Sequence, residues 1–278
     1  MKRLTDMYRP LTASPFSQDD SYCELMPCPA LRPYIRCFWG TRRPLPSAAG
    51  SGLVIPDTCI DIIFDIDYTD SCWTGGVCCV DERSHKTFGT DVGAKVHINA
   101  TFAIRFYAWT AVLFAERDLS STRNRYFPVD EFFSALRKEL QPLLFDVPTL
   151  TGKAAAAERF LLKRLDGIRV NNDLMNVLHM MISSCGRARL TDICGSIALS
   201  ERSLERIFSS HIGVSPKTFS DLVRYQLLWQ ELMSGRRFDA ADAVERFGYF
   251  DQAHLLNDFR KRHLMSMRDA VELAMKLR

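Results

Sequence analysis

The chain has 278 residues, of which 47% are hydrophobic and 25% are charged, a composition that excludes disordered and fibrous proteins. This length predicts roughly two domains. The first residues, MKRLTDMYRPLT, contain no apolar stretch of the kind a signal peptide needs, and no apolar run is long enough to span a bilayer. We therefore expect a cytoplasmic protein without membrane contact.

The formal net charge of +3 is unevenly distributed along the chain. From Cys185 onward there are 15 Lys and Arg against 12 Asp and Glu, which leaves 36 − 15 = 21 basic and 33 − 12 = 21 acidic residues before it. All the excess positive charge thus lies in the last third. This pattern favours a polyanionic partner for that part of the chain.

The N-terminal part combines strand signals with a few helices. Eleven of the twelve prolines precede Thr149, and β-branched runs lie between them. Strands are predicted within residues 52–66, 76–80 and 95–107, and a helix over 129–145 that Pro142 disturbs. We expect a mixed, mainly β, barrel-like domain over residues 1–150.

Several aromatic side chains of this part are candidates for an effector pocket, because aromatic residues commonly line small-molecule sites. The alternative is that they are ordinary core residues. The candidates are Trp39, Trp73, Phe106, Tyr107 and Trp109.

Nine cysteines are present, seven of them in the first 79 residues. No pair has the C-x₂-C spacing typical of zinc sites, and adjacent Cys78 and Cys79 on a strand would point to opposite faces. Buried reduced thiols are the first interpretation, and thiol or metal sensing the alternative. We expect no metal and no cofactor. Neither a phosphate-binding glycine loop nor an H-E-x-x-H motif occurs, so we expect no enzyme activity.

From Thr149 onward the pattern becomes helical. Helices are predicted from Thr149 or Thr151 to Gly167 and over residues 172–184, and we treat 151–184 as a helical connector. The region 185–278 should then be an all-α domain. The expected fold class is therefore α+β, with a mainly β N-terminal domain followed by helices.

Two similar segments lie in this last region, LSERSLERIFSSHIGVSP at 199–216 and FDQAHLLNDFRKRHLMSM at 250–267. Together with the residues just before it, the first segment forms a helix-turn-helix pattern. This pattern consists of a short helix from Leu190, a tight turn and a second helix capped by Ser200. The second unit repeats it, with a helix from Gln252 to Arg262. A long helix within 215–235, about 26 Å long for about 17 residues, joins them and would set the two reading helices near one DNA turn apart.

The outward faces of the two second helices carry the candidate DNA contacts. Arginines can donate to phosphates or guanine, and glutamate can accept from cytosine, although such a face can also be merely solvated. In the first helix these residues are Arg202, Glu205, Arg206 and Ser209, and in the second Ala253, Leu256, Asn257, Arg260 and Lys261.

The last ninety residues resemble the DNA-binding domain of the AraC/XylS family of transcription regulators. The residues that carry this resemblance are Ser200, Leu204, Arg206, Phe208, GVSP at 213–216, Arg224, Gly248, Asp251, His254, Phe259 and Arg260. It implies a sequence-specific regulator whose two reading helices enter successive major grooves of promoter DNA. Because members of the family commonly activate transcription, it also implies an activator. It also implies RNA polymerase as a partner and an N-terminal domain that binds an effector, forms a homodimer, or both.

The second unit departs from the family pattern. Leu264 and Met267 replace the glycine and proline of the usual G-x-S-P, and Ala253 and Leu256 cannot hydrogen-bond a base, although either could touch a thymine methyl. We expect this unit to contribute mainly phosphate contacts, through Arg260, Lys261 and Arg262. An alternative is a protein-interaction regulator that has lost DNA binding.

Overall fold

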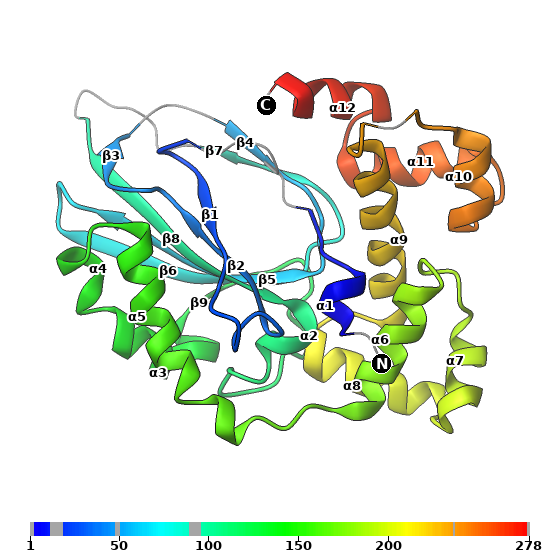
Figure 1. Cartoon of the computed structure of the whole chain (residues 1–278), viewed down its shortest axis with the longest axis horizontal. Coiled ribbons are helices and arrows are strands. Elements are labelled where there is room, and N and C mark those ends of the chain that lie inside the picture. Colours follow the sequence, from blue (N-terminus) through cyan, green and yellow to red (C-terminus); the bar gives the residue numbers. More distant parts are fainter. Residues whose placement is uncertain (1–2, 12–18, 48–50, 89–95, 236, 277–278) are drawn as a thin grey trace.

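The computed structural model of the chain describes residues 3–11, 19–47, 51–88, 96–235 and 237–276 (Figure 1). An antiparallel β-sheet domain comes first and helices follow, which confirms the predicted α+β class. In the first part the elements are α1 (Leu4–Met7), β1 (Cys23–Leu25), β2 (Ile35–Gly40), β3 (Leu45–Pro46), β4 (Ser51–Val54), β5 (Cys59–Asp67), β6 (Cys72–Cys78), β7 (His85–Phe88), β8 (Ile98–Tyr107), α2 (Ala108–Ala111), β9 (Tyr126–Pro128), α3 (Asp130–Leu140) and α4 (Leu143–Asp146).

The large sheet has the strand order β1-β2-β8-β5-β6-β9, with β3 also paired to β8, and β4 and β7 form a separate two-stranded sheet. The segment predicted as a strand over 52–66 is therefore two strands in different sheets. Between them lies Pro56, which has no N–H for a ladder. The helix predicted over 129–145 is likewise interrupted at Gln141 and Pro142, as the proline indicated.

Alternation along β5 divides the large sheet into an apolar and a polar face. Ile60, Ile62 and Phe64 are fully buried, whereas Asp61 and Asp65 point the other way. Helices α3 and α5 cover the apolar face, and the β4–β7 ribbon lies on the other side (Figure 1). The core of the N-terminal part is thus a sheet packed against helices.

The predicted connector holds α5 (Leu150–Leu162), a short 3₁₀ turn (Leu165–Gly167) and α6 (Asn172–Ser183). Thr149 caps α5 by accepting from Gly152 N–H, as expected. Helix α5 packs against the sheet, whereas α6 packs against the helices that follow. The domain boundaries at 150 and 184 stay predictions.

The regular elements in the described part of the C-terminal region are all helices. Among the described residues of the whole chain, no helix has the length and apolar character needed to span a bilayer. The elements of the C-terminal region are α7 (Leu190–Ile197), α8 (Glu201–Ile212), α9 (Pro216–Leu232), α10 (Ala240–Phe247), α11 (Gln252–His263) and α12 (Met267–Lys276). Figure 1 shows α7 and α8 at one end of α9, and α10 and α11 at the other.

Candidate nucleic-acid interface

Helix α8 is fixed by its cap and by its apolar face. Ser200 Oγ accepts from the backbone N–H of Ser203 at 3.2 Å, which satisfies one of the free donors at the helix start. Leu204 and Phe208 are buried, and the Phe208 ring meets Phe219 of α9 edge-on at 5.8 Å. The opposite face of α8 therefore turns outward.

The outward face of α8 carries the predicted reading residues. Arg202, Glu205 and Arg206 are exposed and Ser209 is half-buried. Within the described chain, the side chains of these four residues have no hydrogen-bond or ion-pair partner. Two guanidinium groups and a carboxylate are thus available to an external ligand.

Helix α11 is built in the same way. Asp251 caps it by accepting from His254 N–H at 2.7 Å, and its apolar side chains Leu255 and Phe259 are fully buried. Phe259 packs against Tyr225 and Trp229 of α9, with ring centroids 5.8 and 6.0 Å apart. The long helix α9 therefore forms part of the core of both units.

The outward face of α11 is apolar at one end and basic at the other. Ala253, Leu256, Asn257, Arg260 and Lys261 are all exposed, and none of their side chains has a hydrogen-bond or ion-pair partner among the described residues.

Arg262 does not belong to this face, and the expectation that it contacts phosphate is wrong. It is 9% exposed, and its guanidinium pairs with Asp258 at 3.2 Å and Asp221 at 3.7 Å. Arg262 therefore ties α11 to α9. The helical spacing indicates this position, because Arg262 follows Phe259 by three residues and Leu255 by seven and so shares their buried face.

Helix α9 has the predicted length and cap. It spans 17 residues, which corresponds to about 26 Å, and Ser215 Oγ accepts from Thr218 N–H at 3.1 Å with Pro216 in the first turn. It is a stiff connection between the two units.

Sequence reasoning missed a set of contacts between the sheet domain and both reading helices. Leu119 N–H donates to the Ser210 carbonyl of α8 at 2.8 Å, and Ser84 N–H donates to the Arg262 carbonyl of α11 at 2.7 Å. Thr218 Oγ1 of α9 donates to Glu82 at 3.2 Å. Such backbone pairings over long sequence separations leave no local signal. They fix both reading helices relative to the N-terminal domain.

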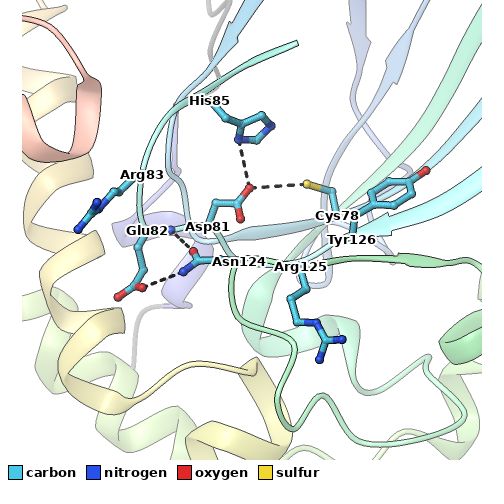
Figure 2. A pocket seen from close by; sticks show the side chains of 8 residues that line it. All are labelled: Cys78, Asp81, Glu82, Arg83, His85, Asn124, Arg125 and Tyr126. Atoms are coloured by element: carbon cyan, nitrogen blue, oxygen red, sulfur yellow. Dashed lines mark hydrogen bonds and ion pairs between the residues drawn. The ribbon is translucent and has the colours of Figure 1, made fainter. Parts of the chain in front are cut away.

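A cavity of about 540 Å³ adjoins these contacts (Figure 2). At its centre the Asp81 carboxylate meets His85 Nδ1 at 3.4 Å and Cys78 Sγ at 4.0 Å. Burial raises the pKa of the Cys78 thiol, so this thiol stays protonated. The full lining is Cys78, Asp81, Glu82, Arg83, His85, Asn124, Arg125 and Tyr126.

None of the five predicted pocket aromatics lines this cavity. Phe106 lies on the apolar face of the sheet, stacked on Phe133 at 6.2 Å. Tyr107 and Trp109 stack at 4.9 Å where the sheet domain meets the helices, and Trp109 contacts Phe219 edge-on. All three predicted residues are almost fully buried.

The other two aromatics lie elsewhere. Trp39 is on the polar face, where its Nε1–H donates to Asp61 at 3.0 Å and Arg105 lies over its ring. Trp73 lies against Phe64 on the opposite face. The structure does not bring the five together, which favours the alternative of core packing, and an effector pocket built from them stays a prediction.

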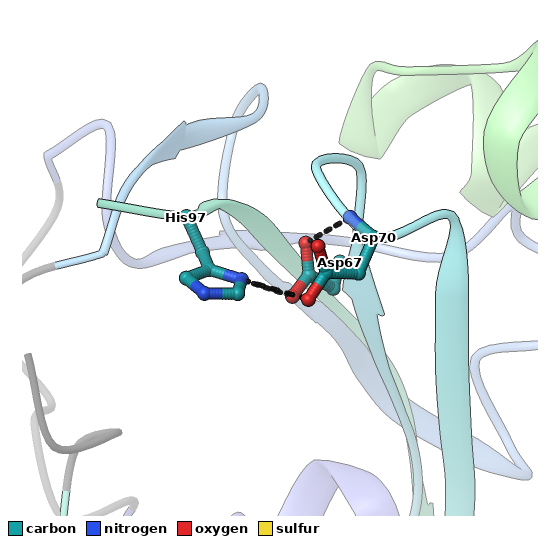
Figure 3. A group of neighbouring side chains, drawn as sticks. All are labelled: Asp67, Asp70 and His97. Carbon is teal, nitrogen blue, oxygen red and sulfur yellow. Dashed lines mark hydrogen bonds and ion pairs between the residues drawn. The ribbon is translucent and has the colours of Figure 1, made fainter. Parts of the chain in front are cut away.

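One group of described residues has the arrangement that could hold a metal ion (Figure 3). His97 Nδ1 lies 2.6 Å from Asp67 Oδ2 and 3.6 Å from Asp70 Oδ2. Asp67 Oδ1 also accepts the N–H groups of Thr69 and Asp70, so hydrogen bonds within a turn account for much of this arrangement. All nine cysteines are described, and none of them forms a disulfide in the structure.

Comparison with known proteins agrees with the geometry of the C-terminal region. Residues 193–271 match the family "Helix-turn-helix domain", and residues 23–128 match a domain of unknown function (DUF6597). The search of curated proteins gave no match. The first of these families is a DNA-binding domain and not a catalytic one.

Among solved structures, the chain is similar to ToxT from Vibrio cholerae, with a TM-score of 0.41 and 11% identity over 85% of this chain and 98% of that one. A ToxT structure bound to an unsaturated fatty acid gives a TM-score of 0.40 and 10% identity over 84% and 94%. A likeness at this level says nothing about ligands or partners.

Proposed function

We propose that this chain, a DNA-binding regulator with an AraC-type helix-turn-helix domain at its C-terminus, binds a specific DNA sequence through α8 and α11 in successive major grooves. The observation that supports this proposal most is the pair of capped helices, held on one stiff helix, whose outward side chains have no partner within the described chain. Arg202, Glu205 and Arg206 would read bases in the first groove. Arg260 and Lys261 would contact phosphates in the second.

The proposed regulation acts through the N-terminal domain. The segments around Glu82 and Leu119 contact α8, α9 and α11. A conformational change in the N-terminal domain would therefore alter the positions of the reading helices α8 and α11. The cavity beside Glu82 is the place we propose for the signal (Figure 2). By family habit the outcome would be activation through contact with RNA polymerase, and the N-terminal domain would also form a homodimer.

Selection of DNA from a random pool by the full chain, followed by gel shifts over a salt series, tests the function. We expect a defined sequence to be enriched and its affinity to fall with salt, with a log–log slope of about −0.9 per phosphate contacted. Arg159→Ala, an exposed arginine of α5, is the matched control and should bind as the parent does. Equal affinity for selected and scrambled DNA would leave only the protein-interaction alternative.

The signal is tested separately by thermal-shift screening of metabolites and divalent metals against the full chain. A ligand of the cavity should raise Tm in the parent, and the rise should be lost in His85→Ala and kept in His179→Ala, which lies far along the chain on α6.

A further inference from the structure

Two of the large exposed apolar side chains of the second unit lie in the N-terminal half of α11 or directly before its cap. Phe250 is 89% exposed and Leu256 is 48% exposed. Phe250 directly precedes the cap residue of α11, and Leu256 lies on the outward face of that helix, three residues after Ala253. Leu256 therefore belongs to the proposed reading face, and Phe250 lies at the start of the helix that carries it.

Charges around this surface complement a polyanion. Arg260 and Lys261 are exposed farther along the helix, whereas the one acid within α11, Asp258, is paired with Arg262 and accepts from Tyr249. No unpaired carboxylate within α11 itself would oppose phosphates. Asn257, also exposed, carries the side-chain amide that pairs with adenine N6 and N7.

We propose that α11 reads thymine through its methyl group, with Leu256 and Phe250 as the contacting side chains. In the major groove the thymine C5 methyl is the one apolar feature of a base edge, so side chains without hydrogen-bonding groups can discriminate only there. With Asn257 on the adenine of a T·A pair, the second half-site contains at least one such pair. This inference rests on the proposed DNA-binding function and goes beyond the expectation that the second unit contributes mainly phosphate contacts.

Deoxyuridine substitution tests this contact, since it removes the methyl and leaves base pairing intact. The sequence selected by the full chain is resynthesised with deoxyuridine for thymine in the second half-site only, and both duplexes are titrated with the parent. We expect the uridine duplex to bind about fourfold more weakly per contacted methyl, the size expected for one buried carbon group. In Leu256→Ala and Phe250→Ala this preference should shrink, each variant losing part of it.

Two control variants separate this effect from others. Arg260→Ala should weaken binding to both duplexes by the same factor, and Leu162→Ala, an exposed leucine of α5, should change neither affinity. Equal affinity of the parent for the two duplexes, or an undiminished preference in Leu256→Ala and Phe250→Ala, overturns the inference while the proposed function stands. A Phe250→Ala variant that loses transcription with an unchanged thymine preference would assign Phe250 to a protein partner instead. A chain that selects no sequence removes the proposed function and the inference with it.

Discussion

Leu264 ends α11 in the same left-handed conformation in which Gly213 ends α8, with φ values of +62° and +86°. The two residues are 51 positions apart and equivalent in the repeat. Leu264 N–H donates to the Arg260 carbonyl at 2.9 Å, so the turn is complete although its glycine is missing. The sequence departure at this point therefore adds backbone strain and does not abolish the motif.

Leu264→Gly should stabilise the protein. A left-handed residue with a Cβ costs about 1–2 kcal/mol, and the 56% exposed leucine side chain contributes little packing in return, so we expect a gain of about 1 kcal/mol in the free energy of unfolding. Urea denaturation measures it. Leu162→Gly, in the last turn of α5, is the control and should lose stability. A decrease in the free energy of unfolding for Leu264→Gly would contradict the inferred backbone strain at this position.

Gly213→Ala should weaken the contact between α8 and the N-terminal domain. A Cβ at Gly213 would lie 2.0 Å from Thr122 Oγ1 and 2.9 Å from the Leu119 carbonyl, in addition to the positive φ. Gly235→Ala is the matched control, because φ there is +74° with no atom within 4 Å of the added carbon. We expect about 1 kcal/mol of destabilisation for Gly235→Ala and at least about 2 for Gly213→Ala in urea denaturation. Equal losses of stability in Gly213→Ala and Gly235→Ala would exclude an energetic role for the contact between α8 and the N-terminal domain.

The reading helices could be predicted because their signals are local. Ser200, Ser215 and Asp251 each cap the helix that follows them, and the spacing of Leu204 and Phe208 fixes which face is buried. These features depend on residues within one or two turns of each other. Sequence patterning is sufficient for such cases.

The predictions that group residues by type or by charge were less successful. Trp39 and Phe106 were grouped by residue type, but alternation along neighbouring strands places them on opposite faces of the sheet. Charge groups Arg262 with Arg260 and Lys261, although helical spacing from Phe259 places Arg262 on the buried face, where Asp221 and Asp258 pair with it. In both cases the grouping by type or charge overlooks the position of the residue on its own strand or helix, which decides the face it lies on.

Glu82→Ala should loosen the domain contact. Glu82 accepts hydrogen bonds from Asn124 at 3.0 Å and Thr218 at 3.2 Å, and its backbone N–H donates back to Asn124. Loss of the carboxylate leaves these donors unpaired, and we expect about 1–2 kcal/mol less stability in chemical denaturation. Glu245→Ala, an exposed glutamate of α10, should change it by less than about 0.5 kcal/mol. Similar effects of the two substitutions would argue against this contact.

His263 should make the stability of the chain depend on pH. Burial lowers the pKa of His263 to about 4, and its Nδ1 is 2.7 Å from the Tyr225 hydroxyl, which suits a neutral imidazole. The pKa in the unfolded chain is about 6.5, so the unfolded state binds the proton first. The stabilising contribution is therefore complete above about pH 6.5 and is lost as the pH falls toward 4, by up to about 3 kcal/mol.

The His263→Gln variant isolates this contribution from the other titrating groups. Its unfolding free energy should fall less steeply than that of the parent between about pH 6.5 and 4, in matched urea denaturation series. His179→Gln, at a half-buried position of α6, is the control and should retain the parent's slope. Parallel pH profiles for all three proteins would show that His263 is protonated without penalty in the fold.

Arg206 allows charge and geometry to be separated at the proposed first reader. If it donates two hydrogen bonds to one guanine, Arg206→Ala should cost about 1–3 kcal/mol and relax the preference for that base, measured with the selected duplex and its single-base variants. Arg206→Lys keeps the positive charge but cannot form the paired bonds, so it should keep the salt slope of the parent and still lose the base preference. A lysine variant with the full preference would reduce Arg206 to a phosphate contact, because a point charge would then suffice.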